Sequence, residues 1–305
     1  MHELTVLFGR IFPLYVIVLM GYVAGKRMKV EKESIASLLI YFIAPIVVFN
    51  GVVSAPKEVA FLTLPILTFI VACFLSVIFY TFARRYFNGA ERNLIGFMSG
   101  TGNTGYFGLP VILALFGTDY QNIAILATLG FVLFENTLGY YYIAKHDLSA
   151  KEAMTKVFQL PAVYAYIVGI VCSFLGYKPT GVIADTVSYF RGAYVVLGMI
   201  IIGVGLSSVT KASFDKKLVS ISFVAKFLAF PSVILLLREL NELYGFYDDK
   251  VIDVLFVLSV TPIASNTVAF ATKMKAHPEK AALTVLVSTL VALVYIPLFV
   301  AVVVK

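Results

Sequence analysis

Two ionisable side chains lie deep inside long apolar segments of this 305-residue chain: Glu135 in GFVLFENTLGYY and Lys226 in SFVAKFLAFP. A charge inside a membrane-buried segment is rare and marks a path for an ion, a proton or a substrate. On a helix that rises about 1.5 Å per residue, Glu135 lies roughly 15 Å from Lys145, and Lys226 lies roughly 13 Å from Lys217. These comparable depths allow the two charges to pair.

The chemistry expected of this pair is ion or proton coupling. We interpret Glu135 as a proton or cation site, and Lys226 as its counter-ion or as a contact for a substrate carboxylate. Two simpler interpretations stay open. Glu135 could be a structural carboxyl group, and Lys226 could extend its ammonium to the membrane surface along an apolar stem.

Two other apolar segments contain helix-breaking residues. GTGNTGYFGLP occupies residues 100–110, and SVTPIASNTVAFA occupies residues 259–271. Glycine and proline are the poorest helix formers, and both segments contain the dipeptide Asn-Thr. Breaking a span exposes N–H groups that carry about half a positive charge, and these cannot face lipid. We therefore expect the breaks to face each other around a polar cavity suited to a carboxylate.

The residues of these two breaks form the predicted site. Because asparagine is a favoured N-cap residue, we expect Asn103 to cap the helix that follows it. Asn50 follows a helix bent at Pro45 and is added as a side chain that could face the crossing. The predicted substrate-binding residues are Thr101, Gly102, Asn103, Thr104, Pro262, Ser265, Asn266, Thr267 and Asn50, and the predicted helix-breaking residues are Gly100, Gly105 and Pro110. The simpler alternative is a pair of kinked helices, since Gly and Pro are common in membrane spans.

The elements that must position these residues are membrane-spanning helices. The chain is 60% hydrophobic and 13% charged, with a mean hydropathy of +0.94, whereas soluble domains carry about 25% charge. The apolar runs have the length of spanning helices and are too long for barrel strands. Ten spans are predicted near residues 5–25, 34–53, 59–83, 92–116, 121–144, 158–176, 186–209, 218–238, 251–274 and 281–304.

Basic residues give these spans a direction. Most of the 24 lysines and arginines fall in the segments that follow the odd-numbered spans. Basic loops stay on the cytoplasmic side, so we predict a multi-pass protein of a bacterial inner membrane with both termini outside. The net charge of +7 is explained by basic residues that orient the spans in the membrane. Nucleic acid is therefore not an expected partner. Cys73 and Cys172 lie in apolar runs and indicate neither a disulfide framework nor a metal site.

Ten spans divide into two halves of five. Because five is odd, the halves at residues 1–150 and 151–305 must cross the membrane in opposite directions. An inverted repeat with interrupted spans in matching positions is typical of secondary transporters. The fold class expected is therefore an all-α polytopic membrane protein, with two inverted five-helix repeats and discontinuous fourth and ninth helices that cross.

Several segments resemble the auxin efflux carrier family. GNTGYFGLPVILALFG (102–117) resembles the family's fourth span, LIYFIAPIVVFNGVVS (39–54) its second, VAKFLAFPSVILLL (224–237) its eighth and HPEKAALTVLVSTLVALVYIPLF (277–299) its last. The resemblance covers nearly the whole chain. It implies the same ten-helix fold, a substrate site where the broken helices cross, and transport of a small organic anion such as an auxin-like acid or a dicarboxylate. It implies no cofactor beyond a coupling ion, H⁺ or Na⁺.

Three other functions fit the sequence less well. An intramembrane enzyme would need a catalytic constellation, but the histidines at 2, 146 and 277 lie in loops or at the terminus, and no H-E-x-x-H motif is present. A channel would share the broken helices. A retinal-type receptor built on Lys226 is disfavoured by ten spans and by the absence of tryptophan. Substrate identity, direction, coupling and a homodimer are left open.

Overall fold

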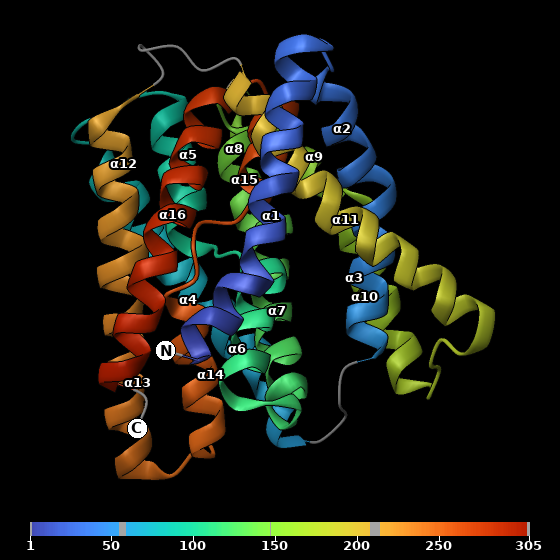
Figure 1. Cartoon of the computed structure of the whole chain (residues 1–305), viewed down its shortest axis with the longest axis vertical. Helices are drawn as coiled ribbons and strands as arrows, with labels where there is room; N and C mark the ends of the chain where they lie inside the picture. Colours follow the sequence, from blue (N-terminus) through green and yellow to red (C-terminus); the bar gives the residue numbers. More distant parts are fainter. Residues whose placement is uncertain (1, 55–58, 147, 208–213, 304–305) are drawn as a thin grey trace.

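Helices make up all the regular structure of the described part of the chain (Figure 1). This computed structural model describes residues 2–54, 59–146, 148–207 and 214–303. The α-helices are α1 (His2–Arg27), α2 (Lys32–Leu38), α3 (Ala44–Val53), α4 (Val59–Ala83), α5 (Ala90–Gly100), α6 (Leu109–Phe116), α7 (Gln121–Phe134), α8 (Tyr140–Ala144), α9 (Ala150–Phe158), α10 (Pro161–Phe174), α11 (Gly181–Ser207), α12 (Lys216–Phe223), α13 (Phe230–Tyr244), α14 (Asp249–Ser259), α15 (Asn266–Lys273) and α16 (Pro278–Val303). A 3₁₀ turn (Thr118–Tyr120) and π-helical turns at Leu39–Ile43, Thr104–Gly108, Glu135–Gly139 and Val224–Ala229 join some of them.

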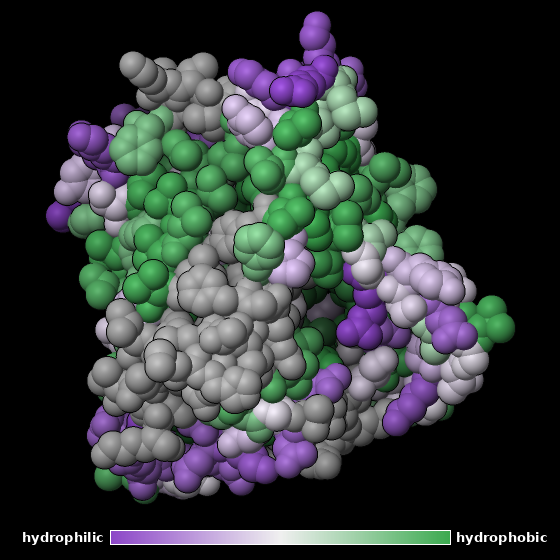
Figure 2. Space-filling model, in the orientation of Figure 1, coloured by the Kyte–Doolittle hydropathy of each residue, from purple (hydrophilic) through white to green (hydrophobic). Residues whose placement is uncertain are grey.

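Six helical segments of the described part are long and apolar enough to cross a membrane. They are Lys32–Val53, Thr63–Ala83, Ile123–Ala144, Gly181–Ser207, Lys216–Tyr244 and Pro278–Ile296, and a seventh results if α9 and α10, which meet at a bend of 50°, count as one span. On the face shown in Figure 2, hydrophobic side chains cover much of the coloured surface, and hydrophilic ones lie toward its top and bottom and also on the right at mid-height. The chain is therefore a multi-pass membrane protein.

Three of the ten predicted spans need separate comment. Those at 92–116 and 251–274 correspond to α5 with α6 and to α14 with α15, and each is interrupted, so neither forms one continuous helix. The span predicted at 5–25 falls on α1, where the side chains of residues 2–11 lie outside the described part. Each of the other seven predicted spans overlaps one of the six spanning segments given above or the bent α9–α10 pair.

Helix α9 corrects one sequence-based expectation, because its residues were assigned to a loop. The segment is helical because its start carries a capping box. The Ser149 hydroxyl accepts the N–H of Glu152 at 3.3 Å, and the Glu152 carboxylate accepts the N–H of Ser149 at 2.9 Å. The pattern S-x-x-E was visible in the sequence, but the lysines around it suggested only a basic loop.

We divide the helices other than α9 into two groups. The first, here called the panel helices, comprises α1, α2, α3, α10 and α11, in which α1 packs along α11 and α10 packs along α3. Glycines permit the close packing of α1 on α11. A Cβ atom on Gly21 would collide with the carbonyl oxygen of Ile200, and a Cβ atom on Gly203 would collide with the carbonyl oxygen of Val18. The second group, the core helices, comprises α4 to α8 and α12 to α16.

The interrupted helices lie within the core helices and run in opposite directions. In Figure 1, α5 and α15 lie toward the top of the view, and α6 and α14 lie toward the bottom. Aromatic rings fill the space beside them: Phe97 of α5 contacts Phe270 of α15 edge-on at 5.6 Å between ring centroids, and Phe134 of α7 at 6.2 Å. The two breaks, residues 101–103 and 260–265, therefore meet in the interior.

Candidate functional site

The two helix breaks are hydrogen-bonded to each other through their backbones. The N–H of Asn103 donates to the carbonyl oxygen of Pro262 at 2.7 Å. Gly102 leaves no room for a larger residue at this contact, because a Cβ atom there would lie 2.6 Å from the Lys226 ammonium and 2.6 Å from the Thr261 hydroxyl. The glycine is thus required by close approach, and it places backbone from the first break directly against a side chain of the second break and one from the turn between α12 and α13.

Asn103 occupies the predicted N-cap position, but it bonds through its backbone. Its carbonyl oxygen accepts the N–H groups of Phe107 at 3.1 Å and Gly108 at 2.9 Å, and its side chain makes no capping hydrogen bond. The segment that follows begins as the π-helical turn Thr104–Gly108, in which N–H groups bond five residues back. The Asn103 amide is left to face the space between the breaks.

Asn266 has a different role, because it is the first residue of α15 and acts through its side chain. Its Nδ2 donates to Oε2 of Glu135 at 2.6 Å, and its Oδ1 accepts the hydroxyl of Tyr194 at 3.0 Å. The other oxygen of Glu135 accepts the hydroxyl of Thr101. A single buried carboxylate therefore holds a residue from each break, and Tyr194 extends the network to the panel helix α11.

Lys226 lies beside this network with its charge enclosed. Its side chain is 0% exposed, its Nζ lies 4.3 Å from the centroid of the Phe230 ring, and the ammonium has no hydrogen-bond partner within the described residues. The interpretation in which Lys226 extends to the membrane surface is wrong. Its charge and that of Glu135 interact, although no salt bridge within 4.0 Å joins these two side chains. The chain thus buries a carboxylate and an ammonium beside the meeting point of the breaks.

Both charged residues lie in π-helical turns. Glu135 opens the turn Glu135–Gly139, and Lys226 lies within Val224–Ala229. Such turns are rare in α-helices and are frequent at functional sites, where the extra residue redirects side chains. Nothing in the residue types of ENTLG or VAKFLA predicted this geometry.

A cavity of about 410 Å³ opens between the breaks and the panel helices. The first residues of both resumed helices line it, so two helix N-termini with their partial positive charge face the same space. Asn50 of α3 and Glu135, which opens the turn between α7 and α8, also line it. The predicted residues in its wall are Gly102, Asn103, Thr104, Gly105, Ser265, Asn266, Asn50 and Glu135.

Arg191 is a cavity residue that sequence reasoning missed. The structure places it in α11, in the cavity wall with Tyr194 and Val195. The available signal was an arginine inside the predicted span 186–209. Arg191 is exposed and supplies the cavity with a guanidinium, a donor group that matches carboxylate geometry.

The remaining predicted residues lie behind the cavity wall. Thr101 and Pro262 hold the network together, as described above. Thr267 is fully buried, and its hydroxyl has no hydrogen-bond partner in the described part. Gly100 ends α5, and Pro110 lies in the first turn of α6. No group of three His, Cys, Asp or Glu side chains within the described residues is arranged to hold a metal ion.

Comparison with known proteins agrees with a function in membrane transport. A sequence profile of the family described as membrane transport protein matches residues 6–300. The chain is 27% identical over 297 residues to an uncharacterized transporter of Methanocaldococcus jannaschii, covering 93% of this chain and 94% of that one. It is 25% identical over 205 residues to an uncharacterized transporter of Methanothermobacter thermautotrophicus, covering 65% and 67%. It is also 27% identical over 139 residues to the uncharacterized transporter YfdV of Escherichia coli K12, covering 43% and 44%.

Proposed function

The chain belongs to the membrane transport protein family, and from this premise we propose that it is a secondary transporter of a small organic anion, with a carboxylate as its substrate. The observation that carries the proposal is the cavity between the two helix breaks. Its volume of about 410 Å³ falls in the range of small-molecule sites, roughly 300–1,000 Å³. It opens at the ends of two half-helices, which is a geometry that favours anions.

The charges around the cavity favour an anion over a cation or a neutral solute. Arg191 lies in the wall, and Lys226 lies directly behind Gly102. The one carboxylate in the wall, Glu135, already accepts hydrogen bonds from Thr101 and Asn266 and is offset by the charge of Lys226. A substrate carboxylate would bind to Arg191, to the amide of Asn103 and to the N–H groups at the starts of the two resumed helices.

The proposed transport mechanism is alternating access of the elevator type. The cavity wall is shared between the panel helices, through Asn50 and Arg191, and the core helices, through Asn103 and Asn266. Movement of the core helices against the panel helices would carry the two breaks, and a substrate bound between them, across the membrane. Saturable flux with counterflow would support a carrier, whereas single-channel currents would indicate the channel alternative.

The ten-span inverted repeat, with halves at 1–150 and 151–305, belongs to this proposal. Reciprocal packing supports it, because α1 of the first half packs on α11 of the second, and α10 of the second half packs on α3 of the first. The antiparallel broken helices occupy matching positions. Labelling of single cysteines placed in the loops with a membrane-impermeant reagent would test the expected inner-membrane topology with both termini outside.

Coupling is proposed to run through Glu135. A carboxylate that holds both breaks would transmit binding of a proton or a sodium ion to the geometry of the substrate site. Transport into proteoliposomes under an imposed pH or Na⁺ gradient would distinguish the two ions from uniport. Glu135→Gln should flatten the pH profile of transport, and an unchanged profile would remove Glu135 as a proton site.

Ligand binding can be tested without knowing the substrate. The purified protein would be heated with monocarboxylates, dicarboxylates or aromatic carboxylates, and with the matching neutral amides. A true ligand raises the unfolding temperature by mass action, so a carboxylate should stabilise the protein and its amide should not. Arg191→Gln should abolish the shift, whereas Lys178→Gln, a change of the same charge in the segment before α11, should retain it. Equal shifts from acids and amides would refute the anion proposal.

A further inference from the structure

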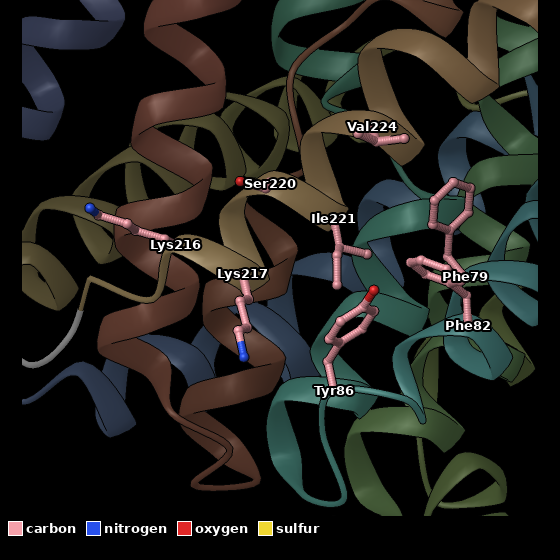
Figure 3. A pocket seen from close by; sticks show the side chains of 8 residues that line it. All are labelled: Phe79, Phe82, Tyr86, Lys216, Lys217, Ser220, Ile221 and Val224. Carbon is pink, nitrogen blue, oxygen red and sulfur yellow. The ribbon is translucent and has the colours of Figure 1, made fainter.

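A second cavity lies on the lipid-facing side of the core helices, where α4 ends and α12 begins. It is a groove of about 380 Å³. Figure 3 shows Phe79 and Phe82 from α4 on one side and Ile221 and Val224 from α12 and the turn that follows it on the other, with Tyr86 and Lys217 at one end. This groove shares no residue with the cavity between the helix breaks.

The groove changes from basic to apolar along its length. Lys216 is the first residue of a membrane-spanning segment, and Val224 lies eight residues further along, about 12 Å deeper at 1.5 Å per residue. On the opposite wall, α4 runs the other way, so Phe79 and Phe82 lie before its end at Ala83 and Tyr86 lies beyond it. The charged end therefore lies at the membrane surface, and the apolar part lies at the depth of the acyl chains.

No described residue neutralises the positive charge at this end. Lys216 and Lys217 have no salt-bridge partner within the described residues. The nearest carboxylate in sequence, Asp215, is already engaged: one oxygen accepts the N–H groups of Lys217 and Leu218, and the other pairs with Lys280 at 3.3 Å. Arg85 adds a further cation, with its guanidinium 6.0 Å from the centroid of the Phe82 ring.

We propose that this groove binds one anionic phospholipid. Its phosphate and acidic headgroup would lie on Lys217, whose ammonium lies 5.9 Å from the centroid of the Tyr86 ring, with Lys216 adding positive charge at the same end. One acyl chain would lie between Phe82 and Val224. Both walls belong to spanning segments, so lipid is the molecule that meets this surface in the membrane. Basic residues at a membrane surface attract anionic lipids, and the exposed rings of Phe82 and Tyr86, at 39% and 49% exposure, supply apolar area for the chain.

The absence of tryptophan from this sequence allows a direct test. Phe82→Trp places the only tryptophan of the chain in the groove. The variant would be reconstituted into vesicles of phosphatidylcholine and phosphatidylglycerol, with brominated acyl chains on either the zwitterionic or the anionic lipid. At equal mole fraction, quenching by the brominated anionic lipid should be stronger, reporting its enrichment in the groove by about fivefold for each lysine that attracts it.

Two double variants decide whether the groove lysines cause the preference. Lys216→Gln with Lys217→Gln should remove it, whereas Lys26→Gln with Arg27→Gln, an equal loss of charge at the exposed end of α1, should retain it. If Phe82→Trp does not fold, Val224→Trp serves as the reporter on the other wall. Equal quenching by the two brominated lipids, or a preference that survives the loss of both groove lysines, would overturn the proposal.

Discussion

The asparagine of the first helix break, Asn103, is held by its backbone, whereas the asparagine that follows the second break, Asn266, is held by its side chain. Asn103 donates its N–H to Pro262 and accepts two N–H groups at its carbonyl oxygen. Asn266 uses its amide to bind Glu135 and Tyr194. The same Asn-Thr dipeptide therefore serves two structural purposes.

This difference separates the two breaks in function. The Asn103 amide makes no hydrogen bond within the described structure and lines the cavity, so it is available to a ligand. The Asn266 amide is already occupied, so it links the cavity to the buried charges and to the panel helix α11. Under the proposed function, Asn103 would contact the substrate and Asn266 would respond to the state of Glu135.

The largest expected effect comes from removing the carboxylate that both breaks share. Glu135→Ala leaves the Lys226 ammonium buried without compensation, which should destabilise the protein by about 3–5 kcal/mol. Thermal unfolding in detergent, followed by circular dichroism, would measure the loss. The double variant Glu135→Gln with Lys226→Met removes both charges and should recover most of the stability. A Glu135→Ala protein as stable as the wild type would show that the pair does not hold the breaks together.

Removing the Asn266 amide should have the next largest effect. Asn266→Ala loses a hydrogen bond to a charged group, worth about 1.5–3 kcal/mol, and also leaves the Tyr194 hydroxyl without this acceptor. The adjacent Thr267→Val is the matched control, because the Thr267 hydroxyl is buried without a partner and its loss should be neutral or stabilising. The stability of both variants is measured by the same thermal unfolding experiment. Equal losses of stability in the two variants would contradict the specific role of Asn266.

Two glycines beside the first break should differ in their tolerance of a methyl group. A Cβ atom on Gly100 would collide with the ring of Phe134 and lie 2.6 Å from the carbonyl oxygen of Ala72, whereas nothing lies within 4 Å of one on Gly105. Overpacking of this kind destabilises by about 1–3 kcal/mol, so Gly100→Ala should lower the unfolding temperature and Gly105→Ala should change it little. Similar temperatures for both variants would show that the first break tolerates crowding.

The smallest expected effect on stability is that of Asn103→Ala. Because the backbone of Asn103 makes its structural contacts, the free energy of unfolding should change by no more than about 0.5 kcal/mol. Binding of the stabilising carboxylate, measured by isothermal titration calorimetry, should nevertheless weaken. Unchanged affinity in this variant would remove Asn103 from the proposed substrate site and erase the functional contrast between the breaks.

The positions of the breaks could be predicted because they are anomalies of composition. Glycine, proline and asparagine stand out in an apolar run, and the interruptions of α5–α6 and α14–α15 fall inside the two predicted segments. Glu135 and Lys226 could be singled out for the same reason. In each case the signal is local, since a single residue type conflicts with its apolar neighbours.

The partners of these residues could not be predicted because they depend on distant parts of the chain. Asn266 and Glu135 lie 131 residues apart, and no local pattern pairs them. Arg191 was visible inside a predicted span, but its place in the cavity wall depends on how α11 packs against the core helices. The sequence also allowed the Lys226 ammonium to extend to the membrane surface. Its enclosure likewise depends on distant residues, such as Gly102 of the first break and Thr261 of the second.

The π-helical turns have a consequence for any comparison of this chain with its relatives. In each turn a backbone hydrogen bond encloses one residue more than in an α-helix. One residue corresponds to about 100° of rotation about the helix axis. A helical wheel drawn for an uninterrupted α-helix therefore assigns the wrong face to the side chains that follow each turn. This applies to α8, after Glu135, and to α13, after Lys226. Deleting one residue from either turn would restore an ordinary helix and leave the far half of the span facing the same neighbours. An alignment of two transporters that differ in such a turn needs a gap in the middle of a membrane helix, where gaps are usually forbidden.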